Sequence, residues 1–359
     1  MVYVGLAVWM LLSFVVSFDD AVHKNTQKKL FLLLVFLFSA LIMGLRGESV
    51  GIDTYSYKEK FDIIARTDIL EIISNFYTSS LEIGYALFMK VCSLVVDNYF
   101  FFQMAYAVIF ATLSAKFLHD NADNILIATV VFFGIGIYAI AFNVSRQMLA
   151  ALLTANSWTY LRKGNKIKAI SLVLVATTMH ITAVVFLCAF LLYALRNKKK
   201  IFKYCLIILM FFALLFDKIM PLVARIFPVY YNYFANEKGT QSAGLVWAIW
   251  LIVSIMAIYI IYNHNRQHTA TEHSIIAFFS IAWCVFNVIG LHFNYFERLG
   301  YYFMPFVVIL FSQFEKTLNP ELLKPIYKTG VCVAFLIYFL LSTWGSEQYA
   351  YTTLFGHIA

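Results

Sequence analysis

Residues 244–262, GLVWAIWLIVSIMAIYIIY, form an unbroken apolar run that decides the class of fold. A helix that crosses a membrane needs about 20 apolar residues. Similar runs recur along the whole chain, near 2–18, 30–45, 99–118, 125–141, 145–161, 201–216, 274–292, 299–314 and 329–344. The pattern predicts an all-α polytopic membrane protein that forms a single integral membrane domain over residues 1–359.

The composition excludes most other classes of protein. Hydrophobic residues make up 62% of the chain and charged residues 13%, whereas soluble domains average about 45–50% and about 25%. The net charge of +8 is interpreted as the positive charge of cytoplasmic loops rather than as a nucleic-acid site. The five cysteines have no paired spacing, which argues against a disulfide framework and against a zinc site.

The distribution of Lys and Arg predicts the topology. Loops rich in these residues face the cytoplasm, which here are 19–29, 116–124, 162–168, 196–203, 263–273 and 315–328. Both termini then lie outside, and two larger outer loops lie near 46–98 and 217–243.

Two segments require a separate interpretation. The stretch 167–195 has basic clusters at both ends, so we expect a hairpin of two short, kinked helices that turns near His180. The alternative is one long tilted helix, which would reverse every later loop. Segment 82–96 is short and carries Glu82 and Lys90, which favours an amphipathic helix on the outer interface. About 11 transmembrane helices then remain.

Four polar clusters fall on the outer side of this topology. The first begins at Arg46 and includes Asp53 and Tyr57. The second, at the tip of a helix hairpin, is Asn143, Arg146 and Gln147. The third is His180, and the fourth contains Glu297, Arg298 and Tyr302.

Each cluster also has a purely structural interpretation. The first could be a solvated loop with an ordinary ion pair, and the second an interfacial turn. His180 could be a packing residue, and the fourth cluster could belong to an aromatic belt at the membrane surface. Several outward arginines nevertheless favour an anionic substrate, because guanidinium groups match phosphate oxygens. A pyrophosphate with a polyprenyl tail would suit both the charge and the apolar helices.

Several motifs are absent from the sequence. No Walker A or GxGxxG fingerprint is present, so a nucleotide cofactor is not expected. No DxD motif falls in an outer loop, which disfavours a metal-dependent reaction. We therefore predict no cofactor, no metal site and no nucleic-acid partner.

The ordered set of motifs resembles the EpsG/Wzy-type bacterial polysaccharide polymerases of O-antigen and exopolysaccharide synthesis. The resemblance rests on these elements, in chain order: Arg46-Gly-x-x-Val-Gly-x-Asp53-x-x-x-Tyr57, Glu82-x-Gly84-Tyr85, Asn143-x-x-Arg146-Gln147, His180 and Glu297-Arg298-x-x-x-Tyr302.

The resemblance implies a glycosyltransferase of the bacterial inner membrane with a layout like the GT-C class. Such an enzyme joins oligosaccharides carried on undecaprenyl pyrophosphate at the periplasmic face and releases undecaprenyl pyrophosphate. Besides this substrate and membrane lipid, a chain-length regulator protein is an expected partner. A flippase or exporter of lipid-linked oligosaccharide, or an O-antigen ligase, is the alternative. Polar clusters gathered toward one face favour an enzyme over a flippase.

Roles for individual residues follow as hypotheses. Arg46, Arg146 and Arg298 are expected to hold the pyrophosphate, with Arg146 acting directly in catalysis. The general base is expected to be His180 or Asp53. The remaining predicted substrate contacts are Glu82, Glu297, Tyr57, Gln147, Asn143 and Tyr302.

Overall fold

A computed structural model describes residues 1–18, 24–74, 81–197, 201–226, 244–267, 271–291 and 294–355. Within these ranges the chain is helical and contains no β-strand beyond a single bridge between Arg46 and Thr353. The prediction of an all-α fold is therefore confirmed. The chain divides into two compact units. Unit 1 comprises Met1–Val184 and Leu318–Ala359, and unit 2 comprises Val185–Thr317.

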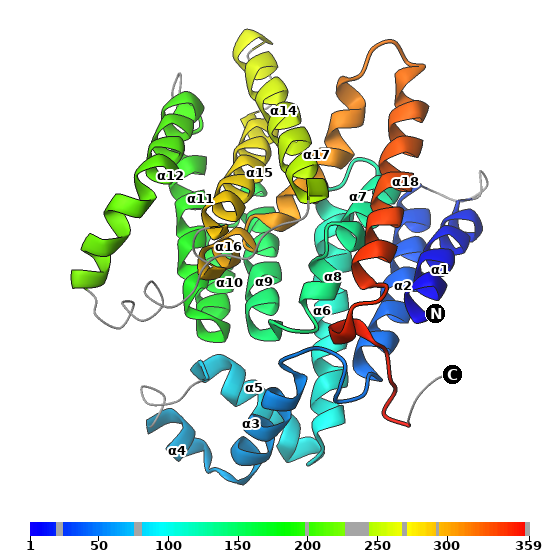
Figure 1. Ribbon diagram of the computed structural model, residues 1–359, viewed down its shortest axis with the longest axis vertical. Coiled ribbons are helices and arrows are strands. Elements are labelled where there is room, and N and C mark those ends of the chain that lie inside the picture. Colours follow the sequence, from blue (N-terminus) through cyan, green and yellow to red (C-terminus); the bar gives the residue numbers. More distant parts are fainter. Residues whose placement is uncertain are drawn as a thin grey trace. The chain divides into compact units, whose positions relative to one another are not determined.

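Unit 1 contains the N-terminal helices and the last long helix (Figure 1). Its helices are α1 (Val2–Ser17), α2 (Lys24–Gly44), α3 (Thr54–Arg66), α4 (Ile69–Ser74), α5 (Ile83–Val95), α6 (Tyr99–Asn121), α7 (Ile125–Gly134), α8 (Ile137–Ile140), α9 (Ser145–Arg162), α10 (Lys166–Met179) and α18 (Leu323–Thr343). The helices of unit 2 are α11 (Leu187–Leu195), α12 (Ile201–Ile226), α14 (Gly244–Gln267), α15 (Thr271–Gly290), α16 (Asn294–Gly300) and α17 (Met304–Phe314).

Five of the described helices are long and apolar enough to cross a membrane. These spans are Lys24–Gly44, Tyr99–Asn121, Val246–Asn263, Glu272–Gly290 and Leu323–Thr343. Further apolar helices are shorter, among them α1, α5 and α7. The chain is thus a multi-pass membrane protein, and the predicted total of about 11 crossings stays a prediction.

The centre of unit 1 is α9, which packs against α6 and α10. Almost all of its residues are buried, including Trp158. A tight turn at Gly164, with φ of 80°, joins it to α10, because glycine adopts positive φ without a steric penalty. This buried pair gives the residues at the two helix ends fixed positions.

Helix breaks differ from the predicted apolar runs at two places. The run 125–141 is divided at Gly136, whose φ is 102°, and the run 299–314 is divided between α16 and α17. A predicted break is present, since α10 ends at Met179 and His180 is extended. A short 3₁₀ helix (Ile181–Phe186) follows it.

The two predicted periplasmic loops contain helices. Residues 46–98 include α3, α4 and α5, whose apolar side chains form a core of their own around Phe61, Tyr85 and Phe102 of α6. The opposite face of α5 is also apolar and exposes Val91, Leu94 and Val95. A helix is thus present over 82–96 as expected, and its place on the membrane interface stays a prediction. In the other loop, α12 continues to Ile226. The rest of that predicted loop, 227–243, lies outside the described residues.

Candidate functional site

The carboxylate of Glu82 contacts two other polar side chains of unit 1. Its Oε1 lies 2.5 Å from Nδ1 of His180, and its Oε2 accepts a hydrogen bond from Nη1 of Arg146. The three side chains are 19%, 21% and 21% exposed, respectively. Each is thus largely shielded from water but still reachable from outside. We call this group the Arg146–Glu82–His180 cluster.

Three helix ends bring the cluster together. Glu82 is the residue before α5 and has an extended backbone. Arg146 is the second residue of α9, and His180 follows the last residue of α10. Because α9 and α10 form a packed hairpin, Arg146 and His180 are held at the same end of that pair, and α5 supplies the acid.

Gly84 allows α5 to approach α10 closely. A Cβ atom at this position would lie 2.3 Å from Oγ1 and 2.8 Å from the backbone oxygen of Thr178. Contacts that short do not occur between real side-chain carbons and their neighbours, and the backbone oxygen cannot move aside without disturbing α10. The absence of a side chain at Gly84 therefore lets Glu82 reach His180.

Aromatic rings support the cluster from α3 and α5. The rings of Tyr57 and Tyr85 are 5.7 Å apart, and the guanidinium carbon of Arg146 lies 6.0 Å from the centre of the Tyr57 ring. The hydroxyl of Tyr85 lies 2.7 Å from that of Ser145, the residue before Arg146. A cation over a ring face is attracted by the ring's quadrupole, so Tyr57 helps to hold the arginine in place.

Lys60 is a second cation at this site, and the sequence reasoning did not select it. Its Nζ lies 6.0 Å from the centre of the same Tyr57 ring. Burial and the neighbouring positive charge of Arg146 lower the pKa of Lys60, while Asp53 and Glu82 oppose that change. The spacing of the sequence could have indicated Lys60. Asp53, Tyr57 and Lys60 are three or four residues apart, so they share one face of α3.

The electrostatics of Glu82 follow from its two partners. Burial raises the pKa of this carboxyl, but the hydrogen bond from His180 and the positive charge of Arg146 outweigh burial and lower the pKa to about 2. Glu82 is therefore a permanent anion near neutral pH. A carboxylate this weakly basic is a poor proton acceptor and a good anchor for its neighbours.

Arg46 lies in a different environment. Its side chain is buried, Nη1 donates to the backbone oxygen of Met43 at 3.0 Å, and its guanidinium carbon is 4.7 Å from the centre of the Phe142 ring. Its backbone oxygen accepts a hydrogen bond from Gln103. This conformation gives Arg46 a packing role at the end of α2, and its contact with substrate stays a prediction.

The C-terminal segment, residues 346–355, is hydrogen-bonded to the loop between α2 and α3. The backbone N–H groups of Gly47 and Gly51 donate to the backbone oxygens of Thr352 and Gln348. Asn143 joins this contact, since its Oδ1 accepts from the N–H of Ile52 at 2.7 Å. Asn143 therefore holds two loops together in this structure, and its predicted contact with substrate stays a prediction.

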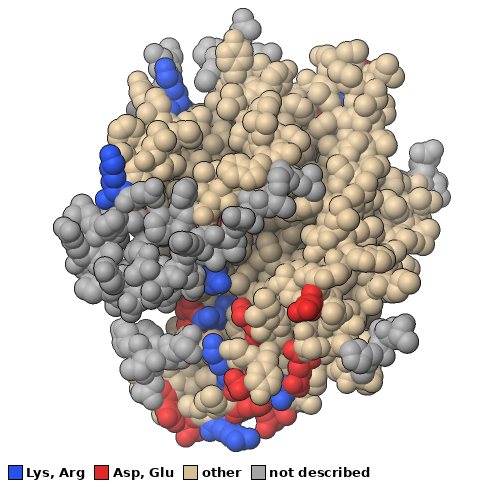
Figure 2. Space-filling view, in the orientation of Figure 1, with Lys and Arg blue, Asp and Glu red and all other residues tan. Residues whose placement is uncertain are grey.

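Charged side chains gather over the end of unit 1 that carries α3, α4 and α5, whereas the surface over α1 and α18 is almost uncharged in the same view (Figure 2). This division matches a membrane protein whose polar end faces water. A model of the EpsG family matches residues 29–354 of the chain. The chain belongs to the EpsG family. No curated protein and no solved structure matches it.

Membership in the EpsG family indicates a polysaccharide polymerase-type role for this membrane protein, with a lipid-linked sugar as substrate. The suspected relationship from the sequence motifs is thereby confirmed. Of those motifs, Tyr57, Glu82, Arg146 and His180 come together, while Asp53 lies close enough to affect Lys60. Gln147 is buried within α9.

The last EpsG-type motif belongs to unit 2. Glu297 and Arg298 are on α16, where the hydroxyl of Tyr301 donates to Oε1 of Glu297 at 3.3 Å. Burial raises the pKa of Glu297. Arg298 is exposed, and Tyr302 is buried. His292 and Phe293, which precede this motif, lie outside the described residues.

Glu82 provides a direct test of this geometry. We expect its carboxyl to protonate near pH 2, so the cluster's contribution to stability is complete above about pH 4.5 and is lost as the pH falls toward 2. The infrared band of a protonated carboxyl, in wild type minus Glu82→Gln, measures this midpoint. A midpoint at the ordinary value, about 4.3, would contradict the contacts described above.

Proposed function

We propose that the protein is a polysaccharide polymerase that joins oligosaccharide units carried on undecaprenyl pyrophosphate. The reaction takes place at the periplasmic face of the bacterial inner membrane, needs no metal and releases undecaprenyl pyrophosphate. Membership in the EpsG family supports the general role. The observation that carries the reaction is the double contact of Glu82 with Arg146 and His180, because it joins a phosphate-binding group to a proton acceptor.

The cations of the site serve the leaving group. As the bond between the sugar and the pyrophosphate breaks, negative charge grows on the pyrophosphate oxygens. Arg146 and Lys60 both lie 6.0 Å from the centre of the Tyr57 ring, and the charge of Arg146 acts on Lys60, so we assign both cations to the same diphosphate. Fixed cations stabilise the transition state more than the ground state, since the charge they bind is greater there.

His180 is the general base in this mechanism. Because the Glu82 carboxylate lies 2.5 Å from Nδ1, the proton of neutral imidazole resides on Nδ1 and the lone pair on Nε2. Nε2 takes the proton of the acceptor hydroxyl while that oxygen bonds to the anomeric carbon of the donor. The anomeric carbon–oxygen bond breaks, and undecaprenyl pyrophosphate leaves with the electron pair. Glu82 orients the base and stabilises the imidazolium that forms.

Other predicted residues are assigned supporting roles. Asp53 acts on Lys60, whose positive charge it favours, rather than as the base. Arg298, Glu297 and Tyr302, as well as Gln147 and Arg46, remain proposed substrate contacts. A chain-length regulator protein remains a proposed partner, and both termini are proposed to be periplasmic.

Replacement of Arg146 tests the reaction. Purified wild-type protein, given its undecaprenyl-pyrophosphate oligosaccharide with chelator and no nucleotide sugar, is expected to form a ladder of oligomers on a gel. Arg146→Ala should reduce the rate on the order of 10²–10³-fold. Arg66→Ala is the matched control, because Arg66 is exposed at the end of α3.

The same assay has outcomes that contradict the proposal. A ladder of normal intensity from Arg146→Ala would exclude this arginine from the site. If folded wild type forms no ladder, transport of the lipid-linked donor across vesicles would indicate a flippase, and transfer to an added final acceptor would indicate a ligase.

Lys60→Gln tests the second cation. We expect about a ten- to hundredfold lower kcat/KM, as for loss of one hydrogen bond to a charged group, and Lys60→Arg should restore most of it. Lys58→Gln is the control, since Lys58 is paired with Glu48 at 3.5 Å and lies on another face of α3. Equal effects from both glutamine variants would indicate general surface charge and remove Lys60 from the site.

A further inference from the structure

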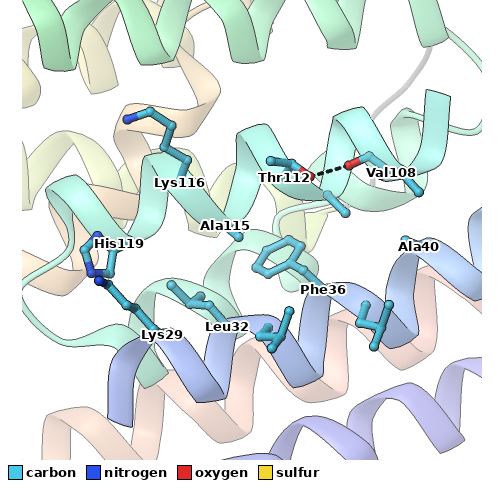
Figure 3. Close-up of a pocket in the computed structure, with 12 residues that line it drawn as sticks. Lys29, Leu32, Phe36, Ala40, Val108, Thr112, Ala115, Lys116 and His119 are labelled. Carbon is cyan, nitrogen blue, oxygen red and sulfur yellow. Dashed lines mark hydrogen bonds between the residues drawn. The ribbon is translucent and has the colours of Figure 1, made fainter. Parts of the chain in front are cut away.

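A groove of about 450 Å³ runs between α2 and α6 in unit 1. Its walls are apolar and include Leu32, Phe36 and Ala40 of α2 and Val108, Ala111 and Ala115 of α6 (Figure 3). Thr112 also lines it, but its hydroxyl donates to the backbone oxygen of Val108 at 2.7 Å. Since α2 and α6 are both long enough to span a membrane, the groove lies at membrane depth and suits a hydrocarbon chain.

One end of the groove is basic. Lys29 and His119 point toward each other there, whereas the ammonium group of Lys116 points away from them (Figure 3). Lys116 and Lys163 share one carboxylate, that of Asp120, at 2.6 and 3.6 Å. Lys29 forms no ion pair with any residue in the described parts of the chain. The end of the groove therefore has more positive than negative charge, which favours an anionic group.

The length of the groove indicates which kind of lipid can occupy it. Lys29 and Ala40 are eleven residues apart on α2, and so are His119 and Val108 on α6. At 1.5 Å per residue this is about 17 Å, which is close to half of a hydrocarbon core about 30 Å thick. A lipid of one leaflet fits this length, whereas a polyprenyl chain reaching from the far surface would leave the basic end empty.

We propose that this groove binds an anionic glycerophospholipid. One acyl chain lies between α2 and α6, and the phosphate contacts the ammonium group of Lys29. Basic pockets between membrane helices recognise anionic headgroups in this way. The site is independent of the proposed polymerase reaction, because none of its residues belongs to the Arg146–Glu82–His180 cluster.

Native mass spectrometry of the full chain tests the proposal. The protein is released from nanodiscs that contain equal amounts of phosphatidylglycerol and phosphatidylethanolamine, and the bound lipid is weighed. Phosphatidylglycerol should be retained in preference. Lys29→Gln should lower its retention about fivefold, the effect of one basic residue near a headgroup. Thr112→Phe, which fills the groove, should remove the bound lipid.

Two control variants make comparable changes at positions outside the proposed site. Lys28→Gln removes the same charge one residue away, and Ile109→Phe adds a ring to a part of α6 that does not line the groove. Both should retain phosphatidylglycerol as the wild type does. Equal retention of the two lipids, equal losses in Lys28→Gln and Lys29→Gln, or full retention in Thr112→Phe would overturn the proposal. If Thr112→Phe does not fold, the comparison of Lys29→Gln with Lys28→Gln still tests the proposal, because Lys29 is exposed.

Discussion

The partly buried carboxylate of Glu82 is the constraint on which the candidate site depends. A charge removed from water is costly unless it is paired and hydrogen-bonded. Glu82 is 19% exposed and is satisfied by Arg146 on one oxygen and His180 on the other. The same carboxylate therefore joins the ends of α5, α9 and α10, orients the imidazole and holds the guanidinium. The packing of the three helix ends and the proposed reaction therefore both require that Glu82 stays ionised.

Much of the fold could be predicted from the sequence, since apolar length and the distribution of charge are local properties. The break at His180 was predicted because basic residues flank the segment on both sides. The divisions at Gly136 and between α16 and α17 were not predicted, because an apolar run looks the same whether it is continuous or bent. The number of membrane crossings does not follow from the apolar runs for the same reason, because helices of 10–17 residues fit more than one placement.

The site was predicted only in part, and the differences have physical causes. Arg46 was selected because a guanidinium suits phosphate, but its side chain is buried against Phe142, a contact between distant parts of the chain. Lys60 was passed over because weight was given to the basic residues that lie at the ends of spans within polar clusters. The contacts of the C-terminal segment with Gly47 and Gly51 could not be predicted, because no local sequence pattern indicates them. The Glu82 contacts themselves span 64 and 98 residues, so motif order indicated the participants but not their pairing.

The most direct measurement is a cryo-electron microscopy structure of the protein with undecaprenyl pyrophosphate bound. The proposed mechanism predicts diphosphate oxygens about 3 Å from the guanidinium of Arg146, next to the Tyr57 ring, with Nε2 of His180 facing the space for the acceptor. A diphosphate bound away from Arg146, with the Arg146–Glu82–His180 cluster covered by protein, would contradict the central claim that this cluster is the catalytic site.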